Sequence, residues 1–144
     1  MSHSKNKVWV HAIWSTKNRM PFISSDIEKK VFDFIKNEFD RLECSLQIIN
    51  GVPDHIHCLF LLNQNKSLAE VLKQIKGSSS HWINQNDLTS SKFAWQTGYA
   101  AYSVSESLIK RVHSYIKNQK QHHLKKTFTQ EYEEFIELHK LENG

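Results

Sequence analysis

Residues 45–62 read SLQIINGVPDHIHCLFLL, two apolar runs joined around Gly51 and Pro53. Apolar runs of this length, separated by turn-forming residues, predict a β-hairpin. In the second strand His55 and His57 share one face, because alternate side chains of a strand point the same way. Two neighbouring imidazoles are costly to bury unless a hydrogen-bond network or a metal ion uses their nitrogens. The stretch therefore predicts a hairpin that carries a candidate metal site, with a hydrogen-bonded histidine pair as the alternative.

Strand and helix patterns alternate along the rest of the chain. KVWVHAIWS (7–15) and FAWQTGYAAYSVS (93–105) are rich in β-branched and aromatic residues and predict strands. Between the first strand and the hairpin, apolar residues recur at helical spacing over 26–43, after a capping-box pattern at Ser25 and Glu28.

Further helices are predicted after the hairpin. Ser67 with Glu70 forms a second capping-box pattern, and the helix it opens becomes uncertain near Gly77. Ser105 or Ser107 caps another helix, and a short acidic helix over 129–141 follows.

This order of elements predicts an α+β protein with a ferredoxin-like split βαβ sandwich. The sheet would be mainly antiparallel, with helices on one face and a further C-terminal helix. The 144 residues are enough for one domain, so we expect a single domain over 1–144.

Composition narrows the class of protein. The hydrophobic content of 39% fits a globular chain, and no apolar run is long enough to span a membrane. The first residues, MSHSKNKVWV, lack the apolar core of a signal peptide. The two cysteines, Cys44 and Cys58, form no CxxC pattern, so we expect a cytoplasmic protein without membrane partners.

Positive charge is concentrated near the C-terminal third of the chain. The net charge is +4 and the pI about 9.0, and the segment 105–126 carries six lysines and arginines against one acid. A solvated helix face is the simplest explanation of such a run. The alternative is contact with DNA phosphates, for which the candidates are Lys17, Arg19, Lys110, Arg111, Lys117, Lys120 and His122.

Four stretches together resemble a known family. They are WVHAIWSTKNR (9–19), PDHIHCLF (53–60), WQTGYAAYSVS (95–105) and VHSYIKNQKQHH (112–123). In order and content they resemble the single-tyrosine HUH transposases of bacterial insertion sequences and their repeat-associated relatives. The name describes two histidines around a bulky hydrophobic residue, as in His55-Ile56-His57.

The resemblance implies a DNA transposase that binds single-stranded hairpin ends as a homodimer. Tyr115 would attack a phosphodiester to give a 5′-phosphotyrosine, and His55, His57 and Gln119 would bind Mg²⁺ or Mn²⁺. No P-loop pattern is present, so no nucleotide cofactor is expected. Tyr115 could serve the histidines of its own subunit or those of a partner.

Physical chemistry is compatible with these roles but leaves alternatives. Tyr115 and Gln119 are four residues apart, so in a helix they share a face at about 5–6 Å between Cβ atoms. Tyr115 could instead be a packing residue, and Gln119 a surface amide. Asp54 could orient a metal-bound imidazole or cap a turn. Nitrogen ligands favour later transition metals over magnesium.

Some aromatic residues are candidates for stacking on unpaired bases, although most aromatic residues of a small protein belong to its core. The candidates are Trp82, Trp95, Tyr99 and Tyr102. Two other functions remain open. One is a domesticated repeat or hairpin DNA-binding protein without transposition activity. The other is an RNA-binding module of related fold, although a clear RNP pattern is absent.

Overall fold

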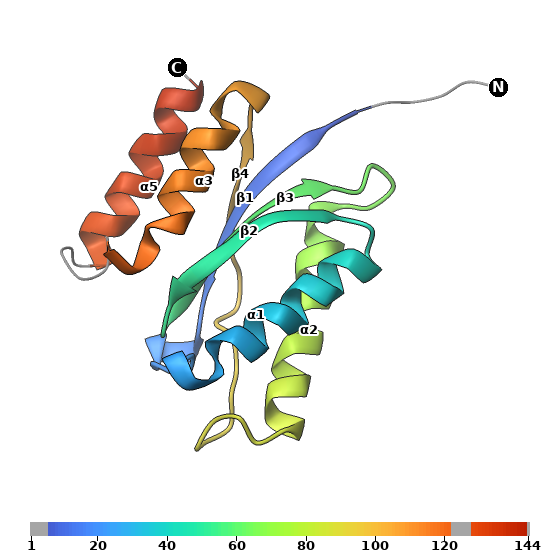
Figure 1. Ribbon diagram of the computed structural model, residues 1–144, viewed down its shortest axis with the longest axis vertical. Helices are drawn as coiled ribbons and strands as arrows, with labels where there is room; N and C mark the ends of the chain where they lie inside the picture. The colour runs from blue at the N-terminus through green and yellow to red at the C-terminus, as the bar shows by residue number, and fades with distance from the viewer. Residues whose placement is uncertain (1–5, 122–127, 144) are drawn as a thin grey trace.

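A four-stranded antiparallel sheet separates two pairs of helices in the computed structural model, which describes residues 6–121 and 128–143 (Figure 1). The strands are β1 (Val8–Ser15), β2 (Ser45–Val52), β3 (His55–Leu62) and β4 (Ala100–Val104), in the order β2-β3-β1-β4. All three pairings are antiparallel. This arrangement confirms the predicted α+β, ferredoxin-like fold.

Helices α1 (Ser25–Arg41) and α2 (Leu68–Gln85) cover one face of the sheet. The larger hydrophobic core lies between this helix pair and the sheet, and no side chain in it exceeds 9% exposure. The strands contribute Val10, Ala12, Trp14, Ile56, Cys58 and Phe60, and the helices contribute Val31, Ile35, Phe39, Val71, Leu72, Ile75 and Ile83. The alternating apolar residues of β1 and β3 thus have the partner that their spacing predicts.

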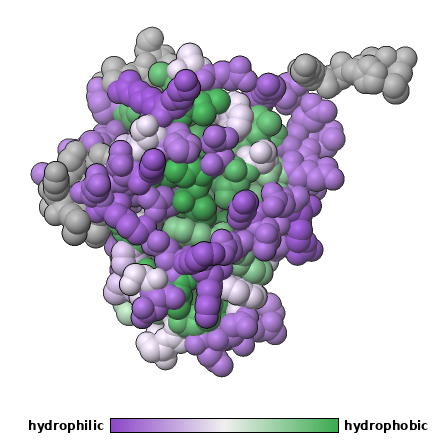
Figure 2. Space-filling model, viewed as in Figure 1, coloured by the Kyte–Doolittle hydropathy of each residue, from purple (hydrophilic) through white to green (hydrophobic). Residues whose placement is uncertain are grey.

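The opposite face is covered by α3 (Ile109–Lys117) and α5 (Phe128–Asn143), with the short 3₁₀ helix η2 (Glu106–Leu108) before α3 (Figure 1). A smaller core forms here from Leu59, Val104, Val112, Ile116 and Leu138. Figure 2 shows hydrophobic side chains gathered where the sheet runs between the two helix pairs. Across the described ranges, no helix has the length and hydrophobicity needed to cross a membrane.

The predicted helix starts are correct for one helix and displaced for the other. Ser67 and Glu70 form the predicted capping box of α2, with 3.1 and 2.7 Å hydrogen bonds. Helix α1 is capped at Ser24 without a side-chain hydrogen bond, and the carboxylate of Glu28 instead lies 2.9 Å from Lys120 Nζ. Helix α2 also continues through Gly77 to Gln85.

The predicted strand 93–105 is too long, since only Ala100–Val104 pairs as a strand. Phe93 and Trp95 are buried in the larger core, and Trp95 makes only an isolated bridge with Thr16. Gly98 then adopts a φ of +91°, which is incompatible with continued strand geometry. The alternating pattern was therefore partly a core-packing pattern.

Alanine substitution at two glycines should have opposite effects on stability. At Gly51 a Cβ would overlap the His55 carbonyl oxygen and lie 2.9 Å from Ile56 Cα, both backbone atoms that cannot move away. At Gly77, inside α2, nothing lies within 4 Å. We expect Gly51→Ala to lower the thermal midpoint and Gly77→Ala to raise stability by about 0.5–1 kcal/mol. Equal midpoints for the two variants would contradict this geometry.

Candidate metal and nucleophile site

Two buried histidines of β3 face the C-terminal helices. His55 and His57 are 1% and 0% exposed, and they point away from the larger core because Ile56 and Cys58 occupy the alternate positions. The predicted pair thus lies side by side, with ring centroids 5.5 Å apart. Its surroundings decide whether the imidazole nitrogens are used by hydrogen bonds, by a metal ion, or by both.

Glu131 of α5 brings a carboxylate to both histidines. Its Oε1 lies 3.0 Å from His55 Nε2 and 3.6 Å from His57 Nε2, and the side chain is 3% exposed. The three residues offer ligand atoms within 4.8 Å of one another, a donor set suited to a divalent cation. The sequence pattern placed this residue in the acidic helix predicted over 129–141 and gave it no role in a site. One signal was available: Leu138 lies seven residues after Glu131, which is about two helical turns, so both residues share the helix face that is buried.

The charges of this group depend on one another. Burial raises the pKa of Glu131, but hydrogen bonds and opposite charge from His55 and His57 outweigh it and hold that pKa well below its usual range. Burial lowers the pKa of His55, but Asp54 and Glu131 outweigh it and raise the net value. Burial dominates at His57 and lowers its pKa to about 4. The raised pKa of His55 favours its protonated form beside the Glu131 carboxylate.

A chain of histidines continues from His57 into the protein. His57 Nδ1 lies 2.9 Å from His11 Nε2, and His11 Nδ1 lies 2.8 Å from His139 Nε2. The ring of Tyr102 stacks on His139 at 4.5 Å. His11 is fully buried, and burial, followed by charge on His57 and His139, lowers its pKa and keeps it neutral.

This chain can fix the tautomer of His57. A neutral imidazole carries one N–H, so each ring must donate at one nitrogen and accept at the other. If a cation lay between His57 and Glu131, His57 would donate from Nδ1 to His11 and His11 to His139, which would leave the lone pair of His57 Nε2 for the cation. That is the form of histidine that binds a metal.

His55 is oriented in a similar way by Asp54 and Arg19. Its Nδ1 lies 2.7 Å from Asp54 Oδ1, and an Arg19 guanidinium nitrogen lies 3.2 Å from the same oxygen. That guanidinium nitrogen is also 3.3 Å from His55 Nδ1. Asp54 therefore contacts the imidazole, as expected for an orienting carboxylate, and Arg19 adds positive charge beside the site.

Tyr115 packs against the histidines of its own chain. Its ring centroid lies 5.8 Å from that of His57 at an interplanar angle of 78°, and its hydroxyl donates to the Glu131 carbonyl oxygen at 3.4 Å. Burial raises the pKa of Tyr115, and the carboxylates of Glu131 and Glu134 raise it further against an opposing hydrogen bond from Gln119. The phenol is therefore protonated at neutral pH.

Gln119 lies two residues beyond the end of α3, and its side chain is fully buried. Its Nε2 donates to the Tyr115 carbonyl oxygen at 3.4 Å. Its Oε1 is buried without a hydrogen-bond partner among the described residues. Because α3 ends at Lys117 and Asn118 caps it, the continuous helical face predicted for Tyr115 and Gln119 is interrupted between them. The buried amide of Gln119 still offers a further oxygen donor inside the protein.

The basic residues predicted to touch DNA are distributed differently. Lys120 Nζ donates to Asn50 Oδ1 at 2.7 Å and to the Gly51 carbonyl oxygen at 3.2 Å. These bonds connect the segment that follows α3 to the β2–β3 hairpin. Arg19 adjoins the site, and His122 lies outside the described residues. The remaining side chains are exposed: Lys17, Lys110, Arg111 and Lys117.

Acidification should destabilise the metal-free protein. His57 has a folded pKa of about 4 against 6.5 when unfolded, so its contribution of about 3 kcal/mol is complete above pH 6.5 and is lost as pH falls through 4. The lowered pKa of His11 acts in the same direction. The raised pKa of His55 acts oppositely, since its contribution is complete below pH 6.5 and declines as pH rises.

Thermal unfolding in chelator between pH 7 and pH 5 tests this balance. We expect the midpoint to fall toward pH 5, and His11→Gln to show a shallower fall because one neutral buried imidazole is gone. A midpoint that rises on acidification would contradict the assignment.

Comparisons with known proteins identify the family of this chain. The model of the IS200-like transposase family matches residues 4–119. A similar protein is the ISDra2 transposase TnpA of Deinococcus radiodurans, 21% identical over 114 residues that cover 76% of this chain and 81% of that protein.

Two solved structures share the fold. A crystal structure of a protein described as a transposase from Deinococcus radiodurans R1 has a TM-score of 0.64 at 21% identity, covering 83% of this chain and 98% of the other. A REP-associated tyrosine transposase bound to a REP hairpin has a TM-score of 0.59 at 16% identity, covering 82% and 72%. Since the family model matches most of the chain, this protein belongs to the IS200-like transposases, as the four motifs predicted.

Proposed function

We propose that this transposase cleaves and rejoins single-stranded DNA by metal-assisted attack of Tyr115. The observation that carries the proposal is that one buried cluster contains a tyrosine hydroxyl, two imidazoles and a carboxylate from three separate elements. The ring of Tyr115 lies 5.8 Å from that of His57, and Glu131 contacts the hydroxyl through its carbonyl and both histidines through its carboxylate. A hydroxyl beside a cation site is the arrangement that phosphoryl transfer requires.

The residues present fit a divalent cation. His55, His57 and Glu131 would hold it, and the buried Oε1 of Gln119 is a fourth candidate donor. When bound, the cation would supply positive charge to the phosphoryl oxygens. The mixed nitrogen and oxygen donors favour Mn²⁺ over Mg²⁺, although both are expected from the family resemblance.

The protein's own groups would control the nucleophile. In the proposed step a bond forms between Tyr115 Oη and phosphorus while the bond from phosphorus to the 3′ oxygen breaks. The phenolic proton leaves and the 3′ oxygen gains a proton, so a 5′-phosphotyrosine and a 3′-hydroxyl result. Because burial keeps Tyr115 protonated and its hydroxyl bonds to the Glu131 carbonyl, entry of DNA must displace that hydrogen bond before attack.

The substrate and assembly are inferred from the related structure and from the family resemblance. The REP-associated relative binds a REP hairpin, which supports hairpin DNA as the substrate of this chain as well. Exposed Lys17 and Lys117, with Arg19 beside the site, supply positive charge for the backbone of the strand. A homodimer would bring two DNA ends together, and action in the cytoplasm is part of the same proposal.

A covalent adduct assay tests the nucleophile. Labelled single-stranded hairpin DNA from the flanks of the gene is incubated with the protein and Mn²⁺, then separated on a denaturing gel. We expect a slowly migrating covalent band that disappears in Tyr115→Phe and in chelator, because the phenolic oxygen is the attacking atom.

The outcome separates this proposal from its alternative. An adduct of undiminished intensity in Tyr115→Phe would contradict the assignment of the nucleophile. A native-gel shift with no adduct at any Mn²⁺ concentration would instead support a domesticated hairpin-binding protein.

A further inference from the structure

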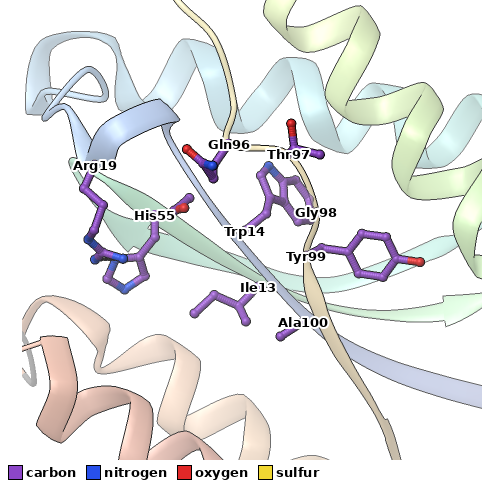
Figure 3. Close-up of a pocket in the computed structure, with 10 residues that line it drawn as sticks. Ile13, Trp14, Arg19, His55, Gln96, Thr97, Gly98, Tyr99 and Ala100 are labelled. Atoms are coloured by element: carbon purple, nitrogen blue, oxygen red, sulfur yellow. Dashed lines mark hydrogen bonds between the residues drawn. The ribbon is translucent and has the colours of Figure 1, made fainter.

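A small cavity adjoins the candidate site on the side of His55. It has a volume of about 180 Å³ and lies where β1 ends and β4 begins (Figure 3). Its walls come from the last residues of β1, from Arg19, from His55 and from the segment 96–100. His55 lines the cavity and also belongs to the proposed cation site, so the two are next to each other.

The cavity is mainly apolar, and an exposed aromatic ring stands at its edge. Tyr99 is 43% exposed, and Figure 3 shows its ring extending outward from the segment that forms one wall. The other aromatic candidates for base stacking have structural partners: Trp82 stacks on Phe34, Trp95 is buried in the larger core, and Tyr102 stacks on His139. Tyr99, by contrast, leaves much of its ring exposed to solvent, where it could contact a ligand.

The wall that carries Tyr99 is held in place by hydrogen bonds. Lys76 Nζ donates to the carbonyl oxygens of Gln96 and Gly98, and the Gln96 N–H donates to the Ser15 carbonyl at 2.8 Å. The φ of +91° at Gly98 turns the chain so that the next residue lies at the rim. A cavity with fixed walls binds without first ordering a loop.

Polar groups at the rim suit a nucleotide. Gln96 Oε1 accepts from the Asn18 N–H at 3.2 Å, which leaves the Nε2 hydrogens of this exposed side chain directed to other acceptors. Arg19, with a side chain 33% exposed, places positive charge between the cavity and the Asp54–His55 pair. Along this surface the positive charge of Arg19, which suits a phosphate, is followed by the apolar cavity with Tyr99 at its edge.

We propose that this cavity binds one unpaired base of the DNA strand, next to the phosphate held at the cation site. Tyr99 stacks on the base and Gln96 hydrogen-bonds to its edge, so the two residues contribute to sequence specificity. The size supports a single planar base, because sites for larger ligands are about 300–1,000 Å³. Stacking plus edge recognition is the usual way in which proteins hold an extruded base. This inference rests on the proposed function.

Abasic scanning tests the proposal in chelator, where binding is measured without cleavage. Oligonucleotides with one abasic position each are titrated against the wild-type protein, Tyr99→Ala, Tyr99→Phe and Gln96→Ala. Met20→Ala serves as the control, since Met20 is 46% exposed and does not line the cavity.

For the wild type, we expect one position at which loss of the base weakens binding about tenfold. In Tyr99→Ala the intact oligonucleotide should bind about tenfold more weakly and the abasic penalty at that position should vanish. Tyr99→Phe and Met20→Ala should behave as wild type, and Gln96→Ala should reduce the preference among the four bases there.

An abasic penalty that persists unchanged in both Tyr99→Ala and Gln96→Ala would overturn the proposal, as would the absence of any sensitive position. If the Tyr115 adduct still forms in that case, only the base pocket is wrong. If the wild type binds no single-stranded DNA and forms no adduct, the proposed function fails as well.

Discussion

The contact between Glu131 and the two histidines of β3 is the interaction on which the site depends. A carboxylate that is 3% exposed would be strongly destabilising by itself, because desolvating an isolated charge costs several kcal/mol. It is tolerated because two imidazoles, 3.0 and 3.6 Å away, share its charge. This requirement fixes where α5 docks on the sheet. The docking of α5 in turn covers Tyr115 and supplies the carbonyl to which its hydroxyl donates.

The same buried groups serve both stability and chemistry. His11 and His139 extend the polar cluster away from Glu131, so His57 is held by a hydrogen bond on one nitrogen while the other faces the carboxylate. Asp54 does the same for His55. Both histidines thus present Nε2 to one point, which a preorganised cation site requires. A divalent cation at that point would neutralise the Glu131 carboxylate, which otherwise relies on its contacts with the two imidazoles.

Local sequence patterns predicted the scaffold and half of the site. The hairpin, the capping box of α2 and the paired histidines all depend on residues within a few positions of one another. Glu131 was not predictable in this way, because it is 76 positions from His55 and lies in a run of acids whose composition resembles a solvated helix. The strand predicted over 93–105 was too long for a related reason. The aromatic residues at its start, Phe93 and Trp95, alternate because they fill the core and not because they pair in the sheet.

The most direct test of this account is the affinity of the protein for Mn²⁺, measured by isothermal titration without DNA. Glu131→Gln keeps the shape of the side chain but removes its charge, and Glu137→Gln is the control on the exposed side of the same helix. We predict that Glu131→Gln weakens Mn²⁺ binding at least about tenfold, a loss seen even for residues that only orient metal ligands, whereas Glu137→Gln leaves it unchanged. Wild-type affinity in Glu131→Gln, with binding lost in Gln119→Ala, would contradict the account and make Gln119 the third ligand.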